Sequence, residues 1–136
     1  MINPVHRHRV YILGPMTGYP DENRPAFRAA AKMLRSMGAV VISPDELDEM
    51  YPIHEPNWEK YLRRDLPFVA KATVGVALPG WRASRGATLE ATVISQLGGP
   101  IYELRDGMPG FLFRPRSLPV PAYVRAPIEP TNETEQ

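Results

Sequence analysis

The 136-residue chain has no cysteine and only three histidines, so its chemistry depends on a narrow set of residue types. The absence of cysteine excludes disulfides, zinc–thiolate centres and thiol nucleophiles, and it fits a reducing compartment. No run approaches the ~18 apolar residues that a membrane-spanning helix needs, and the N-terminus lacks the apolar segment of a signal peptide. We therefore expect a cytoplasmic protein with no membrane partner.

Neither sign of charge dominates, because 16 basic residues stand against 15 acidic ones and the formal net charge is +1. This balance gives no reason to expect a nucleic acid polymer as a partner. The loop after the first apolar run does not match G-x-G-x-x-G, which argues against a standard dinucleotide site. A hydrophobic content of 43% is typical of a globular protein, and the length suits one domain with a real core.

Proline, by contrast, is abundant, and many of the 16 prolines fall late in the chain. Residues 114–136 combine these prolines with a polar end that has no apolar periodicity. We therefore predict one folded domain over residues 1–113 and a proline-rich C-terminal arm over residues 114–136 that is partly disordered.

Short apolar runs that end at glycine, proline or polar residues predict the strands of this domain. They cover residues 9–13, 39–43, 72–78 and 100–104, with a short fifth strand at 111–113. Helical patterns separate them, and residues 44–48 begin either a polar loop or a short helical turn. The alternation predicts a three-layer α/β domain of the flavodoxin or Rossmann type, with a mainly parallel sheet of four to five strands in the order 2-1-3-4-5.

The helical patterns also carry boundary signals. Asn23 and Asn57 are expected to cap the helices that follow them, and Gly38 to end the first. Pro67 falls inside the second helix and predicts a kink or an early end near Leu66.

The stretch from Ser84 to Glu90 opens a helix directly after a buried strand. Glu90 shares the apolar stripe of that helix with Ile94 and Leu97, and burial of a carboxylate there is costly unless it is paired. Free N–H groups and the positive end of the helix dipole favour an anion near the hydroxyl of Ser84. The alternative is that Ser84 only caps the helix and Glu90 interacts with its dipole.

Asp65 is a second acidic residue on an apolar helix face, seven residues after Trp58 and four after Tyr61. It either pairs with a basic neighbour such as Arg64 or Lys60, or faces a polar site at the edge of the sheet. The spacing leaves both alternatives open.

Three segments together resemble the nucleoside 2-deoxyribosyltransferase superfamily, including its nucleoside 5′-monophosphate N-glycosidase branch and uncharacterised phage and bacterial relatives. The resemblance covers roughly residues 10–102. It rests on Tyr11–Gly18, on Arg64-Asp65-Leu66, and on Ser84–Glu90 followed by Leu97–Ile101.

This resemblance implies that Glu90 is the nucleophile at the anomeric carbon, that Asp65 serves the leaving base or the sugar, and that Tyr11 orients the nucleophile. It also implies that Ser84 holds a 5′-phosphate, although Thr88 replaces a glycine of the family motif. The full set of predicted substrate-binding residues is Gly14, Pro15, Thr17, Gly18, Trp81, Ser84, Arg85 and Gly86.

Two features depart from the family pattern. Thr73 stands where an aspartate often opens the third strand, and residues 79–83 form an insertion. Within that insertion, Trp81 either stacks on a base, with Arg82 or Arg85 meeting phosphate, or belongs to a solvated surface loop.

These inferences predict an N-glycosidase that hydrolyses the base–sugar bond of a (deoxy)nucleoside 5′-monophosphate, with a modified base as one option. The chemistry is coherent, because a carboxylate captures an oxocarbenium-like centre while a second group helps the base to leave. The alternatives are a nucleoside 2-deoxyribosyltransferase and a non-catalytic nucleotide-binding module. No metal or cofactor is expected, and the resemblance implies a homodimer or a higher homo-oligomer.

Overall fold

The computed structural model describes residues 3–105 and 112–115, which form a five-stranded sheet covered by helices. The strands are β1 (Arg9–Leu13), β2 (Val40–Ile42), β3 (Val74–Ala77), β4 (Ile101–Leu104) and β5 (Leu112–Phe113). The α-helices are α1 (Arg24–Ser36), α2 (Pro44–Met50), α3 (Trp58–Lys71) and α4 (Arg85–Gln96). Two short 3₁₀ turns, η1 (Pro20–Asn23) and η2 (Trp81–Ala83), precede α1 and α4.

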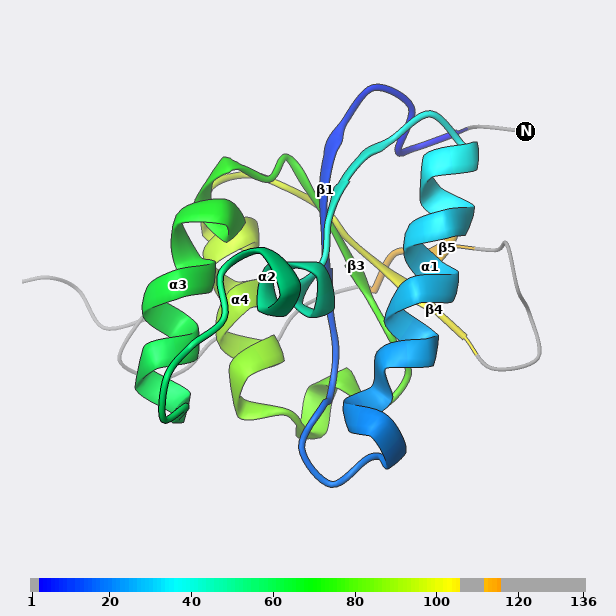
Figure 1. Cartoon of the computed structure of the whole chain (residues 1–136). Coiled ribbons are helices and arrows are strands. Elements are labelled where there is room, and N and C mark those ends of the chain that lie inside the picture. Colours follow the sequence, from blue (N-terminus) through cyan, green and yellow to red (C-terminus); the bar gives the residue numbers. More distant parts are fainter. Residues whose placement is uncertain (1–2, 106–111, 116–136) are drawn as a thin grey trace, which may run out of the picture.

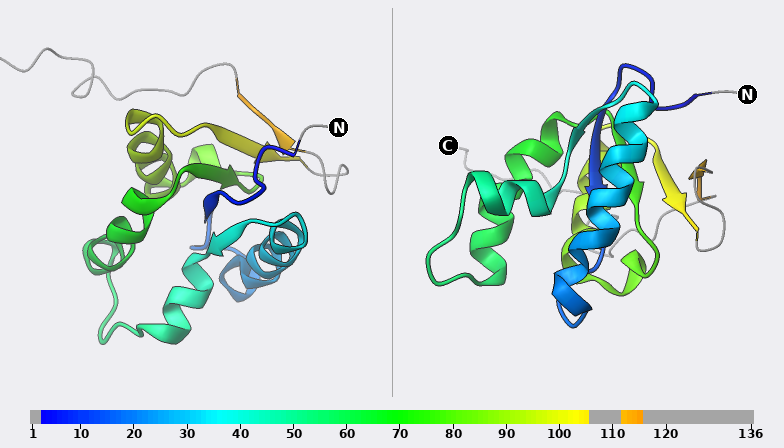
Figure 2. Two further views of the ribbon diagram at one scale, coloured as in Figure 1. Left: turned by 90° about the horizontal axis from the view of Figure 1, so that it is seen from above. Right: turned by 45° about the vertical axis from the view of Figure 1, so that its right-hand side comes forward.

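The strand order is β2-β1-β3-β4-β5, and only β5 pairs in the antiparallel direction. Helix α1 lies on one side of the sheet, whereas α3 and α4 lie on the other, as Figures 1 and 2 show. The predicted three-layer α/β fold and its strand order are therefore confirmed. In such a sheet the carboxyl ends of β1, β2 and β3 meet at one edge, where ligands of open α/β folds bind.

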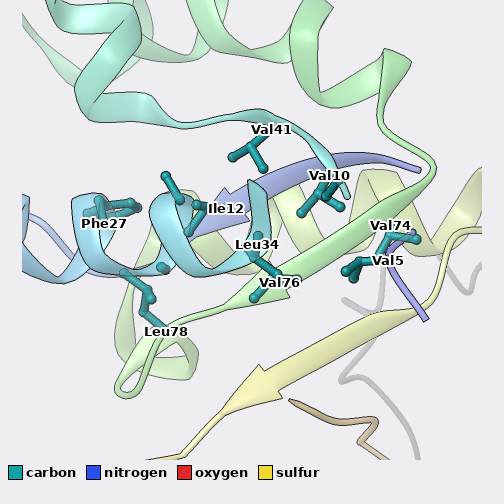
Figure 3. Packing of buried hydrophobic residues seen from close by; sticks show 12 residues of the cluster. Val5, Val10, Ile12, Phe27, Leu34, Val41, Val74, Val76 and Leu78 are labelled. Carbon is teal, nitrogen blue, oxygen red and sulfur yellow. The ribbon is translucent and has the colours of Figure 1, made fainter. Parts of the chain in front are cut away.

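Alternation along β1 divides its side chains between two cores. Val10 and Ile12 pack towards α1 with Phe27 and Leu34 (Figure 3). Tyr11 instead faces the second core, which it shares with residues of α3 and α4. Each fully buried large apolar side chain contributes about 1.5–3 kcal/mol. Tyr11 is thus fixed by packing on a central strand, with its hydroxyl directed to the α3 and α4 side.

Helix α3 runs through Pro67 to Lys71, so an early end near Leu66 is wrong. Proline removes one backbone donor and leaves the carbonyl of Arg63 without its helical partner. Both Pro67 and Arg63 lie on the exposed face, where water can bond to that carbonyl. Packing of Val69 in the core then keeps the last turn in place.

Three further local predictions have mixed outcomes. Asn57 caps α3 as expected, because its side chain accepts a hydrogen bond from the N–H of Lys60 (2.8 Å). Asn23 does not cap α1: it lies in the left-handed region (φ 62°), and its amide donates to the carbonyl of Pro15 (2.9 Å). Residues 44–50 form the complete helix α2, which begins at Pro44.

The buried face of α4 is also rotated from the predicted stripe. Ala87, Ala91 and Ile94 are buried together with Glu90, whereas Leu97 is 62% exposed because the helix has ended before it. Small alanines allow the helix to pack closely on the sheet. Glu90 therefore lies inside the buried face of α4.

The predicted C-terminal arm at residues 114–136 lies outside the described residues except for 114 and 115, and residue 111 of the predicted fifth strand does too. The division into a domain and an arm stays a prediction. None of the helices in residues 3–105 has the length and apolar character needed to cross a lipid bilayer.

Candidate active site

A cavity of about 450 Å³ lies at the carboxyl edge of the sheet. Its walls come from the loop after β1, from the starts of α2 and α3, and from the segment that leads into α4. The lining includes Gly14, Pro15, Met16, Thr17, Tyr19, Glu22, Pro44, Asp48, Trp58, Tyr61, Leu62, Arg64, Asp65, Gly80, Ala83, Ser84, Arg85, Gly86, Ala87 and Glu90. Its volume is within the usual range for small-molecule sites.

Glu90 lies in the wall of this cavity and is only 6% exposed. The hydroxyl of Tyr11 donates a hydrogen bond to its Oε2 (3.0 Å). Burial, followed by the charge of Asp65, raises the pKa of Glu90 to about 8, although the Tyr11 hydrogen bond acts in the opposite direction. Burial likewise raises the pKa of Tyr11 well above its usual value, so the tyrosine remains a donor to the carboxylate.

Asp65 lies in the same wall and is 5% exposed. Its Oδ1 accepts a hydrogen bond from Nε of Arg64 (2.7 Å), and Nη1 of that arginine donates to Oδ1 of Asp48 (2.7 Å). Burial raises the pKa of Asp65, while the bond and the charge of Arg64 lower it. Both sequence-based alternatives for Asp65 thus hold: it pairs with Arg64, and it faces a polar site.

The start of α4 forms another part of the cavity wall. The hydroxyl of Ser84 accepts a hydrogen bond from the N–H of Ala87 (3.2 Å), so Ser84 caps the helix while it lines the cavity. The guanidinium of Arg85 lies 3.5 Å from the centre of the Trp58 ring. This stacking holds a positive charge beside the free N–H groups of the helix start, where an anion is favoured.

The structure brings most predicted site residues together. Eight of them line the cavity: Glu90, Asp65, Gly14, Pro15, Thr17, Ser84, Arg85 and Gly86. Tyr11 is not in the lining, but its hydroxyl donates a hydrogen bond to Glu90. Gly18 is exposed and does not line it; its φ of +85° accounts for glycine at that turn.

Trp81 is not in the cavity, so the prediction that it stacks on a base is wrong. It is 3% exposed, belongs to the second core, and donates from Nε1 to Oε2 of Glu103 (2.8 Å). Arg82 also points to Glu103, with a 3.3 Å contact, and does not line the cavity. The tryptophan that does line it is Trp58, which is 39% exposed.

Sequence reasoning missed the role of several lining residues. It assigned Trp58 and Tyr61 to an apolar face, and it gave no role to Asp48. The usable signal was Asp65 itself: an acidic residue within an apolar stripe needs a charged or hydrogen-bonding partner if it is buried.

Thr73, the departure from the family pattern, lies at the opposite edge of the sheet. Its Oγ1 is 3.0 Å from Nδ1 of His8 and accepts from the N–H of Arg9 (3.1 Å). A second hollow of about 530 Å³ near it has no carboxylate in its lining. Thr73 therefore gives no argument against catalysis at Glu90. Within the described ranges, no group of three or more His, Cys, Asp or Glu side chains is placed to hold a metal ion.

Comparison with known proteins gives the family and a solved structure with the same fold. The model of a family described as a domain of unknown function, DUF4406, matches residues 8–103. Among solved structures, the 2-deoxyribosyltransferase from the psychrotolerant bacterium Bacillus psychrosaccharolyticus matches with a TM-score of 0.56 and 21% identity, over 70% of each chain. No curated protein matches the sequence significantly. The chain thus belongs to the DUF4406 family, and it has the same fold as the solved 2-deoxyribosyltransferase.

Proposed function

We propose that the protein cleaves the N-glycosidic bond of a nucleoside or nucleotide with Glu90 as the nucleophile, and that it passes the sugar to an acceptor. The observation that carries this proposal is the buried Glu90 carboxyl, bonded to Tyr11 and beside Asp65, in a cavity of substrate size. Transfer to a second base is the first candidate, because the solved relative with the same fold is a 2-deoxyribosyltransferase.

In the proposed reaction, an oxygen of ionised Glu90 bonds to C1′ as the C1′–N bond breaks. The electron pair of that bond goes to the base nitrogen, which takes up a proton as the base leaves. In the second half, a nitrogen of another base attacks C1′, gives up its N–H proton and releases the Glu90 carboxylate. Water in its place likewise gives up a proton, and the outcome is hydrolysis. Asp65 assists at the leaving base or at the sugar.

Hydrolysis of a nucleoside 5′-monophosphate is a second candidate, and a specific observation favours it. Arg85 is held against Trp58 at the start of α4, next to the Ser84 hydroxyl and the free N–H groups of the helix. A guanidinium in that place suits a phosphate, since charge-assisted hydrogen bonds to arginine are strong. Figure 1 shows that α4 begins close to the loop after β1, and residues of both segments line the cavity.

The Glu90→Gln variant tests the shared step. Incubation with a panel of nucleosides and monophosphates, with and without a second free base, is followed by chromatography of bases and new nucleosides. We expect the variant to lose at least about 1,000-fold in rate, as for loss of a covalent nucleophile. Glu59→Gln is the matched control, since Glu59 is exposed on α3 and pairs with Arg63. Wild-type rates in Glu90→Gln refute the proposal, and so does nucleotide binding without product, which would favour the non-catalytic module.

Arg85→Met separates the two candidate substrates. If the protein uses monophosphates, kcat/KM for them falls about 10- to 100-fold, the value of a hydrogen bond to a charged group, while nucleosides react as before. Arg82→Met is the control, because that guanidinium contacts Glu103 outside the cavity. An equal effect of both variants would contradict a phosphate role for Arg85. The homo-oligomer implied by the resemblance stays a proposal that analytical ultracentrifugation tests.

A further inference from the structure

Arg64 connects two carboxylates that belong to different helices. Its Nε donates to Asp65 on α3, and its Nη1 donates to Asp48 on α2, each over 2.7 Å. Its side chain is only 10% exposed. The guanidinium also lies 5.1 Å from the centre of the Tyr61 ring. A planar guanidinium held by two carboxylates and a ring has little freedom to rotate.

This arrangement fixes how Asp65 meets the cavity. Arg64 occupies Oδ1 of Asp65, whereas no donor among the described residues reaches Oδ2. The Asp65 side chain is 8% exposed. A buried acceptor without a partner costs about 1–3 kcal/mol, which a donor from a bound molecule would remove.

We propose that Arg64 is a positioning residue: it holds Asp65 ionised and in one orientation, so that Oδ2 accepts a hydrogen bond from a hydroxyl or N–H group of the substrate. This inference rests on the proposed function and specifies what Asp65 does there. It assigns Asp65 the role of acceptor, so the proton for the leaving base comes from another donor.

Four elements supply the titratable and charged groups around Asp65. They are Tyr11 from β1, Asp48 from α2, Arg64 from α3 itself and Glu90 from α4. Arg64 is the cation that lowers the pKa of Asp65, whereas burial and the charge of Asp48 raise it. Loss of the guanidinium therefore favours protonation of Asp65.

Direct binding of an anionic substrate by Arg64 is less well supported. Two carboxylates already balance its charge, and both of the bonds to them are short. Arg85, in contrast, stacks on a neutral ring beside the helix start. A phosphate would therefore meet, at Arg85, a cation that pairs with no carboxylate among the described residues, whereas Arg64 already pairs with two.

The first experiment follows the carboxyl carbons of Asp and Glu by ¹³C NMR as the pH is raised, without any substrate. In Arg64→Met we expect the Asp65 titration to move upward by about 1–3 pH units, the usual effect of losing an adjacent opposite charge. Arg64→Lys keeps the positive charge, so Asp65 should titrate close to its wild-type pH in that variant. Arg63→Met is the matched control, because Arg63 is 77% exposed one residue away and pairs with Glu59.

The second experiment measures kinetics on the best substrate found. Arg64→Met and Arg64→Lys should both lower kcat by about 10- to 100-fold with little change in KM, since an ammonium cannot hold both carboxylates in the guanidinium geometry. Asp48→Asn weakens the contact between Arg64 and α2 while Arg64 and Asp65 themselves stay unchanged. This variant should also lower kcat. These milder variants keep the test informative if Arg64→Met fails to fold.

The outcomes distinguish this inference from the proposed function. An unchanged Asp65 titration in Arg64→Met overturns the inference, and so does a variant that raises KM for monophosphates alone. A wild-type protein with no turnover on any nucleoside or nucleotide refutes the proposed function, whereas the titration result still decides whether Arg64 holds Asp65 ionised.

Discussion

Ionisation of Glu90 should make the protein less stable as the pH rises. The folded chain raises the pKa of this carboxyl from 4.5 to about 8, mainly through burial. Between these values the folded protein holds a proton that the unfolded chain has released, so unfolding becomes easier with increasing pH. The stabilisation from protonated Glu90 is complete below about pH 4.5 and is lost by about pH 8.

The expected size is large for a single side chain. At about 1.4 kcal/mol per pH unit, the difference between the folded and unfolded pKa corresponds to about 5 kcal/mol above pH 8 and about 3 kcal/mol at pH 7. A domain of this size has a total stability of about 5–15 kcal/mol. The effect should therefore be measurable by urea unfolding at a series of pH values.

Glu90→Gln is the reference for this experiment, because glutamine keeps the shape and an acceptor for the Tyr11 hydroxyl but does not titrate in this range. The free energy of unfolding of the wild type, minus that of the variant, should fall by about 5 kcal/mol between pH 4 and pH 9. Most other groups cancel in this difference. Parallel curves for the two proteins would refute the reasoning that burial holds the proton on Glu90.

The same ionisation has a kinetic consequence. With a pKa of about 8, about one tenth of the free protein carries ionised Glu90 at pH 7. Because the carboxylate is the proposed nucleophile, kcat/KM should rise about tenfold from pH 7 to pH 9. Activity and stability would then change in opposite directions with pH.

Two further predictions concern residues outside the cavity. Trp81→Phe removes the hydrogen bond to Glu103 and should cost about 1–3 kcal/mol of unfolding free energy, measured by urea denaturation, with unchanged kcat/KM; a loss of activity at full stability would restore a site role for Trp81. Gly18→Ala should cost about 1–2 kcal/mol, because φ is +85° although nothing lies within 4 Å of an added Cβ; an unchanged melting curve would contradict this.

The fold was predictable because the features that determine it are local. Apolar runs that stop at glycine or proline marked β1 and β3, and their alternation with helical patterns led to the parallel order. The early end expected at Pro67 was wrong. Proline removes the hydrogen-bond partner of the Arg63 carbonyl, and the cost of that loss depends on whether water reaches the carbonyl. The buried positions Asp65 and Val69 leave Arg63 and Pro67 on the exposed side of α3, where the lost hydrogen bond is tolerated.

The site was predictable where residues lie on regular elements. The resemblance singled out Tyr11, Asp65 and Glu90, and the structure places all three on a strand and two helices that pack together. Trp81 could not be placed in the same way, because its direction depends on the 3₁₀ turn after β3 and on Glu103. The sequence analysis placed Trp58 on an apolar helix face, and only the packing shows that it lines the cavity.

The two candidate functions share one end of the cavity and differ at the other. At the Glu90 end, a buried carboxyl of high pKa beside the Arg64–Asp65 pair suits attack on a sugar whether or not the substrate carries phosphate. At the start of α4, the 5′-hydroxyl of a nucleoside would give the Arg85 guanidinium no charged partner. The phosphate of a monophosphate would form an ion pair with it. A phosphate bound there would also add a negative charge to a cavity that already contains ionisable carboxyls, and would favour the protonated form of Glu90. A monophosphate substrate should therefore shift the kinetic pKa upward relative to a nucleoside. The pH profiles of kcat with the two substrates measure that shift directly.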